Sequence, residues 1–163
     1  MKKLQLFILF LISSFCFSQK TIPEVLQKYN LNSVPYITVG ELKSSKNIVL
    51  LDTREVKEFN VSHIENAICV GFDKFNKKKT LSILNDKNAT IIVYCSIGVR
   101  SEKIGKKLIK LGYKNVKNLY GGIFEWKNLN EKIVDNSNSE TQNVHAFSKE
   151  WSVFLKKGIK VYE

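Results

Sequence analysis

The sequence predicts an α/β domain with a mostly parallel five-stranded sheet and helices on both faces. Short apolar, β-branched runs such as 91–94 (IIVY) have the length and composition of strands. Runs of this kind, apolar at every position, are typical of strands that are buried on both faces. They alternate along the chain with segments of helical periodicity, and this alternation favours a parallel sheet.

The first half of the domain contains three predicted strands, at 36–39, 47–52 and 67–70. Helices are expected at 21–30 and 55–60, with a single helical turn around Leu42. Pro23 lies in the first turn of the first helix, where its missing N–H would have no intrahelical acceptor anyway.

The second half is centred on the strand at 91–94. Before it, the apolar residues between Phe72 and Leu84 indicate one or two helical pieces. After it, Ile104, Leu108 and Leu111 recur at i, i+4 and i+7, which predicts an amphipathic helix that starts six residues after Cys95, at Ser101, and stops at Gly112. A last strand at 116–119 and a helix at 123–129 complete the domain.

The chain divides into four predicted segments: 1–18, 19–34, 35–134 and 135–163. The first resembles a cleaved signal peptide, because Lys2 and Lys3 precede an apolar run that ends at a cut between Ser18 and Gln19. We therefore expect an exported protein, periplasmic or secreted. An uncleaved anchor is the alternative, but the apolar run is shorter than the ~20 residues that span a bilayer. Acylation at Cys16 is a further alternative.

The segment 19–34 is expected to form a helical extension, and 135–163 a polar linker followed by a helix at about 148–157. The linker, 135–143, is low in apolar residues. The apolar side chains of the terminal helix would either dock on the domain or bind a protein partner.

The formal net charge of +11, or +9 without Lys2 and Lys3, raises the question of nucleic-acid binding. The lysines are scattered, however, and lack interleaved aromatic residues, so we predict a solvated basic surface and no nucleic-acid partner. Of the 26 basic residues, only Arg54 and Arg100 are arginines. Both lie in turns that follow predicted strands.

Cys95 is the candidate nucleophile. It follows the buried strand at 91–94 and precedes a helix, so backbone N–H groups and the positive end of the helix dipole would converge near its sulfur. Such surroundings lower the pKa of a thiol and make it nucleophilic. Gly98 would supply a backbone conformation with positive φ, and Arg100 an exposed cation that binds anions. The alternative is an inert buried cysteine.

Four ordered motifs carry a family resemblance. They are the loop 95–101 (CSIGVRS), the segment 50–59 (LLDTREVKEF), the segment 63–68 (HIENAI), and 119–126 (LYGGIFEW). Together they resemble the rhodanese-like sulfurtransferases. The resemblance covers about 36–129 and implies a rhodanese-like three-layer domain, with Cys95 and the turn after Asp52 on one rim of the sheet.

The resemblance also implies a mechanism. Cys95 would take sulfur from a small anionic donor such as thiosulfate and pass it, as a persulfide, to a thiol or cyanide acceptor, with no metal or organic cofactor. Loop residues Ser96, Ile97, Gly98, Val99 and Arg100 would bind the anion. Asp52, Arg54, His63 and Ser101 would support the loop, and membrane contact would be limited to the cleaved leader.

Three departures and three alternatives remain. Ser96 and Ile97 replace basic loop residues, which leaves open how well thiosulfate is used. Asn66 replaces a glycine, although asparagine tolerates the left-handed region. Cys69 would be inert or would trap an oxidised Cys95. The alternatives are a non-catalytic binding or sulfur-carrier module, a phosphatase and a thiol oxidoreductase. The C-x4-R spacing, one residue shorter than the phosphatase loop, and the absence of a C-x-x-C motif argue against the last two.

Overall fold

The computed structural model describes residues 21–162, so the predicted leader and its cleavage junction lie outside the described residues. The predicted sheet is confirmed. It contains β1 (Tyr36–Ile37), β2 (Ile48–Asp52), β3 (Ile68–Cys69), β4 (Thr90–Tyr94) and β5 (Asn115–Leu119). The strand order is β1-β5-β4-β2-β3, and every neighbouring pair is parallel. The central strand β4 is therefore covered at both edges.

Six α-helices belong to the described chain: α1 (Ile22–Tyr29), α2 (Val39–Ser44), α3 (Val56–Val61), α4 (Lys77–Ile83), α5 (Val99–Lys110) and α6 (Gly122–Asn128). Local chemistry fixes where several of them begin. Thr21 and Glu24 form a capping box at α1, and Thr38 and Glu41 form another at α2. Each box satisfies two backbone N–H groups that a helix start leaves unpaired.

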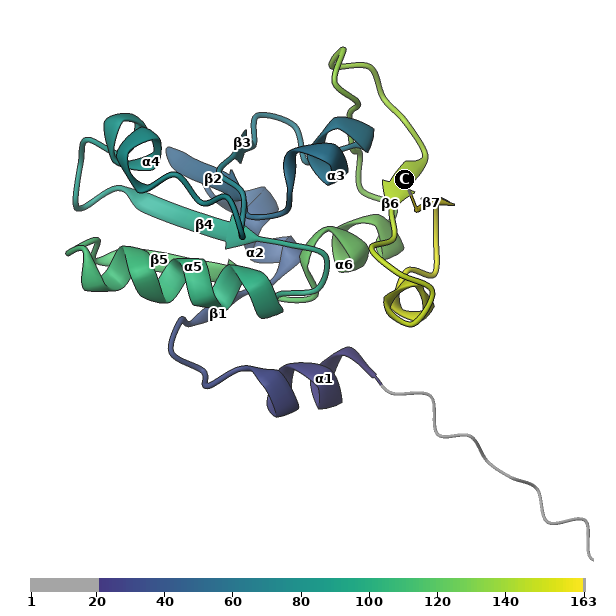
Figure 1. Cartoon of the computed structure of the whole chain (residues 1–163), viewed down its shortest axis with the longest axis horizontal. Helices are drawn as coiled ribbons and strands as arrows, with labels where there is room; N and C mark the ends of the chain where they lie inside the picture. The colour runs from purple at the N-terminus through teal and green to yellow at the C-terminus, as the bar shows by residue number, and fades with distance from the viewer. Residues whose placement is uncertain (1–20, 163) are drawn as a thin grey trace, which may run out of the picture.

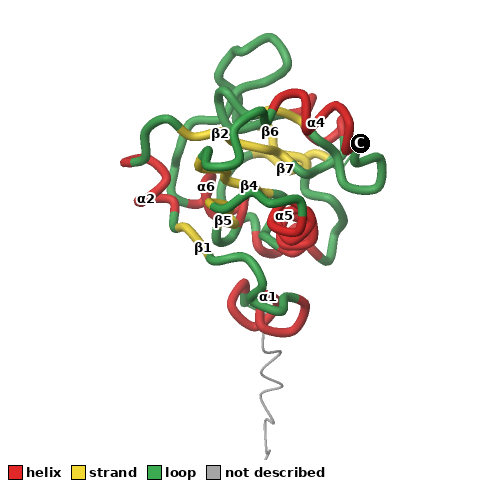
Figure 2. Tube along the Cα trace, turned by 90° about the vertical axis from the view of Figure 1, so that its left-hand side faces the viewer, coloured by secondary structure: helices red, strands yellow, loops and turns green. Residues whose placement is uncertain are grey.

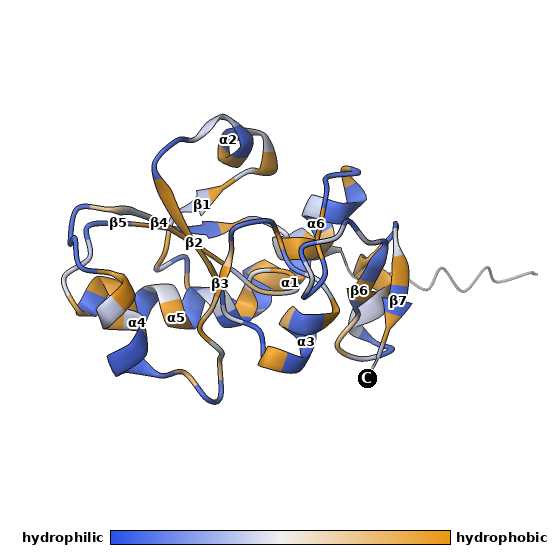
Figure 3. Ribbon diagram, turned by 90° about the horizontal axis from the view of Figure 1, so that it is seen from above, coloured by the Kyte–Doolittle hydropathy of each residue, from blue (hydrophilic) through white to orange (hydrophobic). Residues whose placement is uncertain are grey.

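The alternating side chains of β4 separate two cores. Ile92 and Tyr94 pack with residues of α2, α6 and the C-terminal tail, while Ile91 and Val93 pack with residues of α5 and the end of α4. Figure 3 shows α2 and the pair α4 and α5 on opposite sides of the sheet. Figure 2 shows α5 beside β4 and β5, with α1 set apart from the sheet. A buried strand with helices on both faces is what the apolar run at 91–94 predicts.

Two element boundaries differ from expectation. The strand expected at 36–39 is shorter, because the capping box at Thr38 starts α2 at Val39. The helix after Cys95 begins at Val99 rather than Ser101, directly after Gly98, whose φ is +113°. At its end Gly112 has a φ of +90°, as the predicted helix stop requires.

The C-terminal tail (residues 143–162) does not form the helix expected at 148–157. It contains the parallel strands β6 (Asn143–His145) and β7 (Ile159–Val161), joined through a single 3-10 turn, η1 (Trp151–Phe154). Parallel pairing requires the chain after β6 to return to the start of that strand. The connection is instead irregular apart from η1, because Phe154 and Leu155 are buried in the core while Phe147 and Trp151 line the cavity beside Cys95.

Figure 1 places this tail beyond the carboxyl ends of the central strands. Val144, Phe154 and Leu155 are buried in the same core as Ile123 of α6, so the tail is packed onto the domain. Of the two alternatives for the terminal segment, docking on the domain or binding a protein partner, docking is the one observed. Among residues 21–162, none of the helices is long and apolar enough to cross a membrane.

Candidate active site

Cys95 lies at the carboxyl end of β4, at the bottom of the loop that leads into α5. Its side chain is buried, with 2% of the residue exposed. The preceding strand residues Ile91 to Tyr94 are all fully buried. Removing a large apolar side chain from such a strand would cost about 2–5 kcal/mol, so the sheet holds the cysteine at a fixed position.

The carbonyl groups of the loop are held away from the sulfur. The Cys95 carbonyl accepts a hydrogen bond from the Ile123 N–H at 3.0 Å, and the Ser96 carbonyl accepts one from the Phe124 N–H at 3.1 Å. Both donors belong to the first turn of α6. The loop carbonyls are therefore paired with the N-terminus of a second helix.

The Gly98 carbonyl is held in the same way by two asparagine side chains. Asn118 of β5 donates to it at 2.8 Å, and Asn30, next to α1, donates at 3.1 Å. With these carbonyls tied outward, the N–H groups of the loop and of the first turn of α5 remain for the sulfur and its ligands.

Two glycines make this arrangement sterically accessible. Gly98 occupies a left-handed conformation that side chains resist. Gly122 has a φ of +55° and packs against the loop backbone, so that a Cβ there would meet the Ser96 carbonyl oxygen at 2.7 Å. Gly98 has the positive φ that the sequence predicted, and the double glycine before α6 has a steric reason.

Two donors lie within hydrogen-bonding reach of the Cys95 sulfur. The Gly98 N–H donates at 3.1 Å and the Ser101 hydroxyl lies at 3.6 Å. Burial by itself raises the pKa of this thiol. The charge of Arg100 and the hydrogen bonds from Ser101 and Gly98 outweigh burial, so the pKa of Cys95 falls below its ordinary value. The arrangement favours a thiolate, as expected for a nucleophile.

Arg100 is not the exposed cation that the sequence suggested. Its guanidinium makes two hydrogen bonds of 2.7 Å to the carboxylate of Glu58 and one of 3.1 Å to the Ser96 hydroxyl. Its side chain is only 15% exposed, and that of Glu58 only 2%. The planar guanidinium matches the carboxylate fork, and Glu58 is also fixed by the Glu55 N–H at 3.0 Å. Arg100 thus links the Cys95 loop to α3 through Glu58.

The turn after β2 supports the loop from behind. The carboxylate of Asp52 accepts from the Arg54 guanidinium at 2.6 Å, and both side chains are fully buried. Arg54 also donates to the Ser62 carbonyl at 2.7 Å. Between them, the Thr53 N–H donates at 2.8 Å to the carbonyl of Tyr94, the residue before Cys95. The Asp52–Arg54 pair therefore supports the loop through the backbone rather than by acting on the Cys95 sulfur.

His63 contacts Phe59 of α3, and its role in supporting the loop stays a prediction. Its ring stacks on Phe59 with centroids 3.8 Å apart, and its Nδ1 lies 3.1 Å from the Phe59 carbonyl. The turn that follows it is intact, because Asn66 has a φ of +64°, the left-handed conformation expected for its replacement of glycine.

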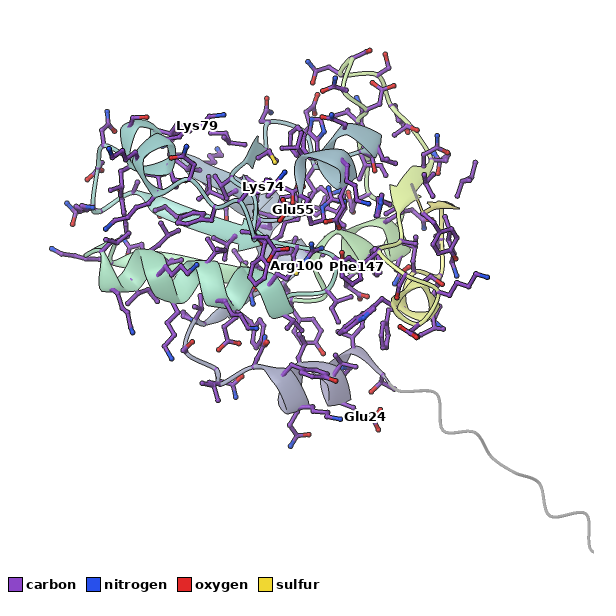
Figure 4. The ribbon with its side chains drawn as sticks, viewed as in Figure 1. Glu24, Glu55, Lys74, Lys79, Arg100 and Phe147 are labelled. Carbon is purple, nitrogen blue, oxygen red and sulfur yellow. The ribbon has the colours of Figure 1, made fainter. Side chains whose placement is uncertain are left out.

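Cys69 is the other free cysteine of the described chain. Burial raises the pKa of its thiol, and Asp52 adds to the rise. It lines a cavity of about 210 Å³ near Lys74 and Lys79, which does not include Cys95 among its lining residues. Figure 4 labels Glu55, Lys74 and Lys79 on that side of the molecule. The thiol of Cys69 is therefore less reactive than that of Cys95.

The C-terminal tail contributes residues that the sequence did not connect with the loop. The ring of Phe147 lies 4.8 Å from the Arg100 guanidinium carbon, and Figure 4 shows the two side chains together. Phe147 and Trp151 line the cavity of about 80 Å³ next to Cys95. His145 is buried with its Nδ1 4.0 Å from Glu58. Within residues 21–162, no group of three or more potential ligands is placed to hold a metal ion.

Comparison with known proteins identifies the domain. The family model for the rhodanese-like domain matches residues 38–129. The chain is 33% identical over 91 residues to a tRNA uridine(34) hydroxylase of Yersinia pestis, a match that covers 54% of this chain and only 26% of that protein. The chain thus spans about a quarter of the length of the curated relatives it matches.

Two solved structures show the same fold. A rhodanese-related protein from Thermoplasma volcanium is 27% identical, with a TM-score of 0.54, over 61% of this chain and 97% of that one. A thiosulfate sulfurtransferase from Pseudomonas aeruginosa is 20% identical, with a TM-score of 0.57, over 75% of this chain and 23% of that one. The four sequence motifs, the parallel sheet and the loop around Cys95 agree with the family match, and the chain belongs to the rhodanese-like domain family.

Proposed function

We propose that this protein is a sulfurtransferase that carries sulfane sulfur as a persulfide on Cys95. The observation that carries the proposal is the sulfur itself, buried at the end of β4 and hydrogen-bonded by the Gly98 N–H at 3.1 Å. A thiolate and a persulfide anion have the same charge. The donors that favour the first therefore favour the second, and the loop suits both states of the catalytic cycle.

The proposed reaction has two displacements. The Cys95 thiolate attacks the outer sulfur of a donor such as thiosulfate, the donor S–S bond breaks, and sulfite leaves with the bonding electron pair. A thiolate or cyanide acceptor then attacks the outer sulfur of the persulfide and regenerates the Cys95 thiolate. Sulfur changes carrier twice, and neither step requires a metal ion or an organic cofactor.

Ser101 has a place in this cycle. Its hydroxyl donates to the Asn118 side-chain oxygen at 2.7 Å and lies 3.6 Å from the sulfur. The hydroxyl has one proton, so it can turn toward the sulfur when negative charge builds up there. We assign Ser101 and Asn118 a positioning role.

Mass spectrometry tests the proposal directly. After incubation with a sulfane-sulfur donor, the protein should gain about 32 Da, one sulfur atom, and lose it on addition of cyanide or a thiol. Cys95→Ser should abolish the adduct and turnover, because a serine hydroxyl is not ionised there. Cys69→Ser is the matched control and should retain both.

The test separates the proposal from its alternative. Turnover that persists in Cys95→Ser, or an adduct on Cys69, would contradict the assignment of the nucleophile. If no donor from a broad panel forms an adduct, a binding or carrier module becomes the better interpretation. The reaction of the Yersinia relatives is not included in the proposal, because the shared region is 26% of that protein.

The proposed place of action is outside the cytoplasm. Its support is the sequence alone: two lysines, an apolar run and the junction at Gln19. N-terminal sequencing of the expressed protein from the exported fraction should begin at or near Gln19. Recovery of a chain that starts at Met1 in the membrane fraction would overturn this part of the proposal.

A further inference from the structure

The tail that covers the Cys95 loop lies outside the region matched by the rhodanese-like family model, which ends at residue 129. It is nevertheless fixed in place. Val144 and Ala146 are fully buried, and the Ala146 N–H donates to the Val161 carbonyl at 2.7 Å. The residues that this tail presents to the loop are therefore a property of this chain rather than of the shared domain.

The cavity beside Cys95 is apolar at its mouth. Loop residues, among them Ile97 and Val99, form one side, and Phe147 and Trp151 form the other. The two aromatic rings meet edge to face, with centroids 6.3 Å apart, and Tyr29 of the N-terminal extension backs Trp151 at 6.2 Å. The two terminal segments thus meet around a cavity that the family domain alone would leave open.

Arg100, the one basic residue lining this cavity, is already paired with a carboxylate. Arg100 makes two hydrogen bonds to Glu58, and the face of its guanidinium lies against Phe147. A dianion such as thiosulfate would have to be desolvated among apolar walls with no unpaired cation in the lining. A hydrocarbon group, in contrast, gains from leaving water.

Phe147 is held in an unusual backbone conformation to face this cavity. Its φ is +67°, a region that residues other than glycine rarely adopt. Its N–H donates to His145 Nδ1 at 3.1 Å, and the neighbouring Ser148 N–H donates to the Ala146 carbonyl at 2.8 Å. Strained residues of this kind persist where the surrounding structure fixes them, often at binding sites.

Phe147 also separates two different environments. On the other side of the Arg100–Phe147 contact lies a cavity of about 420 Å³ whose lining includes Glu55, Lys57 and Asp73. Loss of the Phe147 ring would join the apolar cavity to this charged one and admit water to it.

We propose that Phe147 and Trp151 form a hydrophobic specificity site, which favours sulfane-sulfur donors that carry an uncharged hydrocarbon group on the atom bonded to the reacting sulfur. The inference rests on the proposed function and names its donor class as small organic sulfane-sulfur compounds. For an organic thiosulfonate, the Cys95 thiolate attacks the terminal sulfur, the S–S bond breaks, and the sulfinate leaves with the electron pair. Charge is conserved, and no oxidant or free proton is required.

The test compares benzenethiosulfonate with methanethiosulfonate, which have the same charge and reacting group but different hydrocarbon area. The measured quantity is the kcat/KM of Cys95 persulfide formation for each donor. The wild-type protein should prefer the benzene compound by about tenfold, which corresponds to ~1.4 kcal/mol. In Phe147→Ala the ratio should fall at least fivefold, with the methane compound changed less than about twofold.

The comparison of variants cancels the intrinsic reactivity of the two donors. Phe147→Ala is the primary variant because 47% of the residue is exposed, so its loss removes little core. Phe147→Leu keeps an apolar wall and should retain part of the ratio. Val153→Ala is the matched control, since Val153 is on η1 with Trp151, is 38% exposed and does not line the cavity.

The outcomes are distinct. An unchanged ratio in Phe147→Ala, with persulfide still formed, overturns the specificity site and leaves the proposed function intact. An equal fall in Val153→Ala also overturns it, because a general loosening of the tail would then be the cause. Absence of persulfide with both donors in the wild-type protein overturns the proposed function itself.

Discussion

Replacing Arg100 tests whether the loop is held by a buried ion pair. Arg100 and Glu58 are joined at 2.7 Å with side chains 15% and 2% exposed. The chain offers a matched control at the surface, where Lys43 and Glu131 are also 2.7 Å apart but 51% and 22% exposed. The two pairs have the same N–O distance, but the Arg100 pair is buried with two hydrogen bonds, whereas the Lys43 pair is at the surface with one.

The magnitude follows from that difference. Removal of one partner of a buried pair costs about 3–5 kcal/mol, because the other charge is left without compensation. Glu58 would keep the Glu55 N–H and borders the charged cavity, so we expect about 2–3 kcal/mol for Arg100→Ala. For a domain of this size that lowers the melting temperature by roughly 6–12 °C. Lys43→Ala should cost about 0.5 kcal/mol or less.

A double-mutant cycle completes the test. Glu58→Gln removes the charge but keeps an oxygen for the Glu55 N–H. Urea unfolding followed by circular dichroism should show that Arg100→Ala and Glu58→Gln together cost at least about 1 kcal/mol less than the sum of the single changes. Additive losses, or an Arg100→Ala loss equal to that of Lys43→Ala, would refute the argument that burial makes this pair structural.

Three further predictions concern the loop and the tail. Ser101→Ala should raise the pKa of Cys95 and slow its alkylation by iodoacetamide at neutral pH by about three- to tenfold, since a hydrogen bond to the thiolate is lost. Gly122→Ala should destabilise the fold by about 3 kcal/mol or more in urea, because a Cβ meets the Ser96 carbonyl and the left-handed backbone is strained. Burial lowers the pKa of His145 more than Glu58 raises it. The unfolded chain therefore binds a proton first as pH falls, so stability should decrease below about pH 6.5. His145→Asn should reduce that decrease, measured as urea midpoints between pH 7 and pH 5.

The sheet and the position of the candidate nucleophile, Cys95, could be predicted because they depend on local patterns. The apolar run before Cys95, the helical spacing of Ile104 and Leu108, and the stop at Gly112 each act within one element. The position of Gly98 also followed from local sequence, since a strand-to-helix turn needs one residue with positive φ.

The partners of Arg100 could not be predicted, because they depend on how separate elements meet. Glu58 is 42 positions away from Arg100, and only the parallel order of β2 and β4 brings α3 to the start of α5. Asn118 is similar: its side chain reaches the Gly98 carbonyl because β5 lies beside β4. Strands disfavour asparagine, so an asparagine in a predicted strand indicates a special role, but it does not identify that role.

The helix predicted in the C-terminal tail was wrong for a different reason. Phe147, Trp151, Phe154 and Leu155 have helical spacing, but they make two separate contacts in the folded chain. Phe154 and Leu155 enter the core, whereas Phe147 and Trp151 face the cavity beside Cys95. Tertiary contacts on two sides override a periodicity that is also compatible with a short turn. Nothing in the sequence around Phe147 predicts its positive φ.

The charge balance around Cys95 connects these observations to chemistry. Both arginines near the loop are paired with buried carboxylates, Arg54 with Asp52 and Arg100 with Glu58. The two pairs carry no net charge, but Arg100 still lies close enough to stabilise a thiolate, together with the hydrogen bonds from Ser101 and Gly98. In the proposed cycle these groups face one negative charge on Cys95, whether it is a thiolate or a persulfide. The proposed donor class, which delivers sulfur with a single charge and an apolar remainder, fits a cavity whose one basic residue, Arg100, is already paired with Glu58.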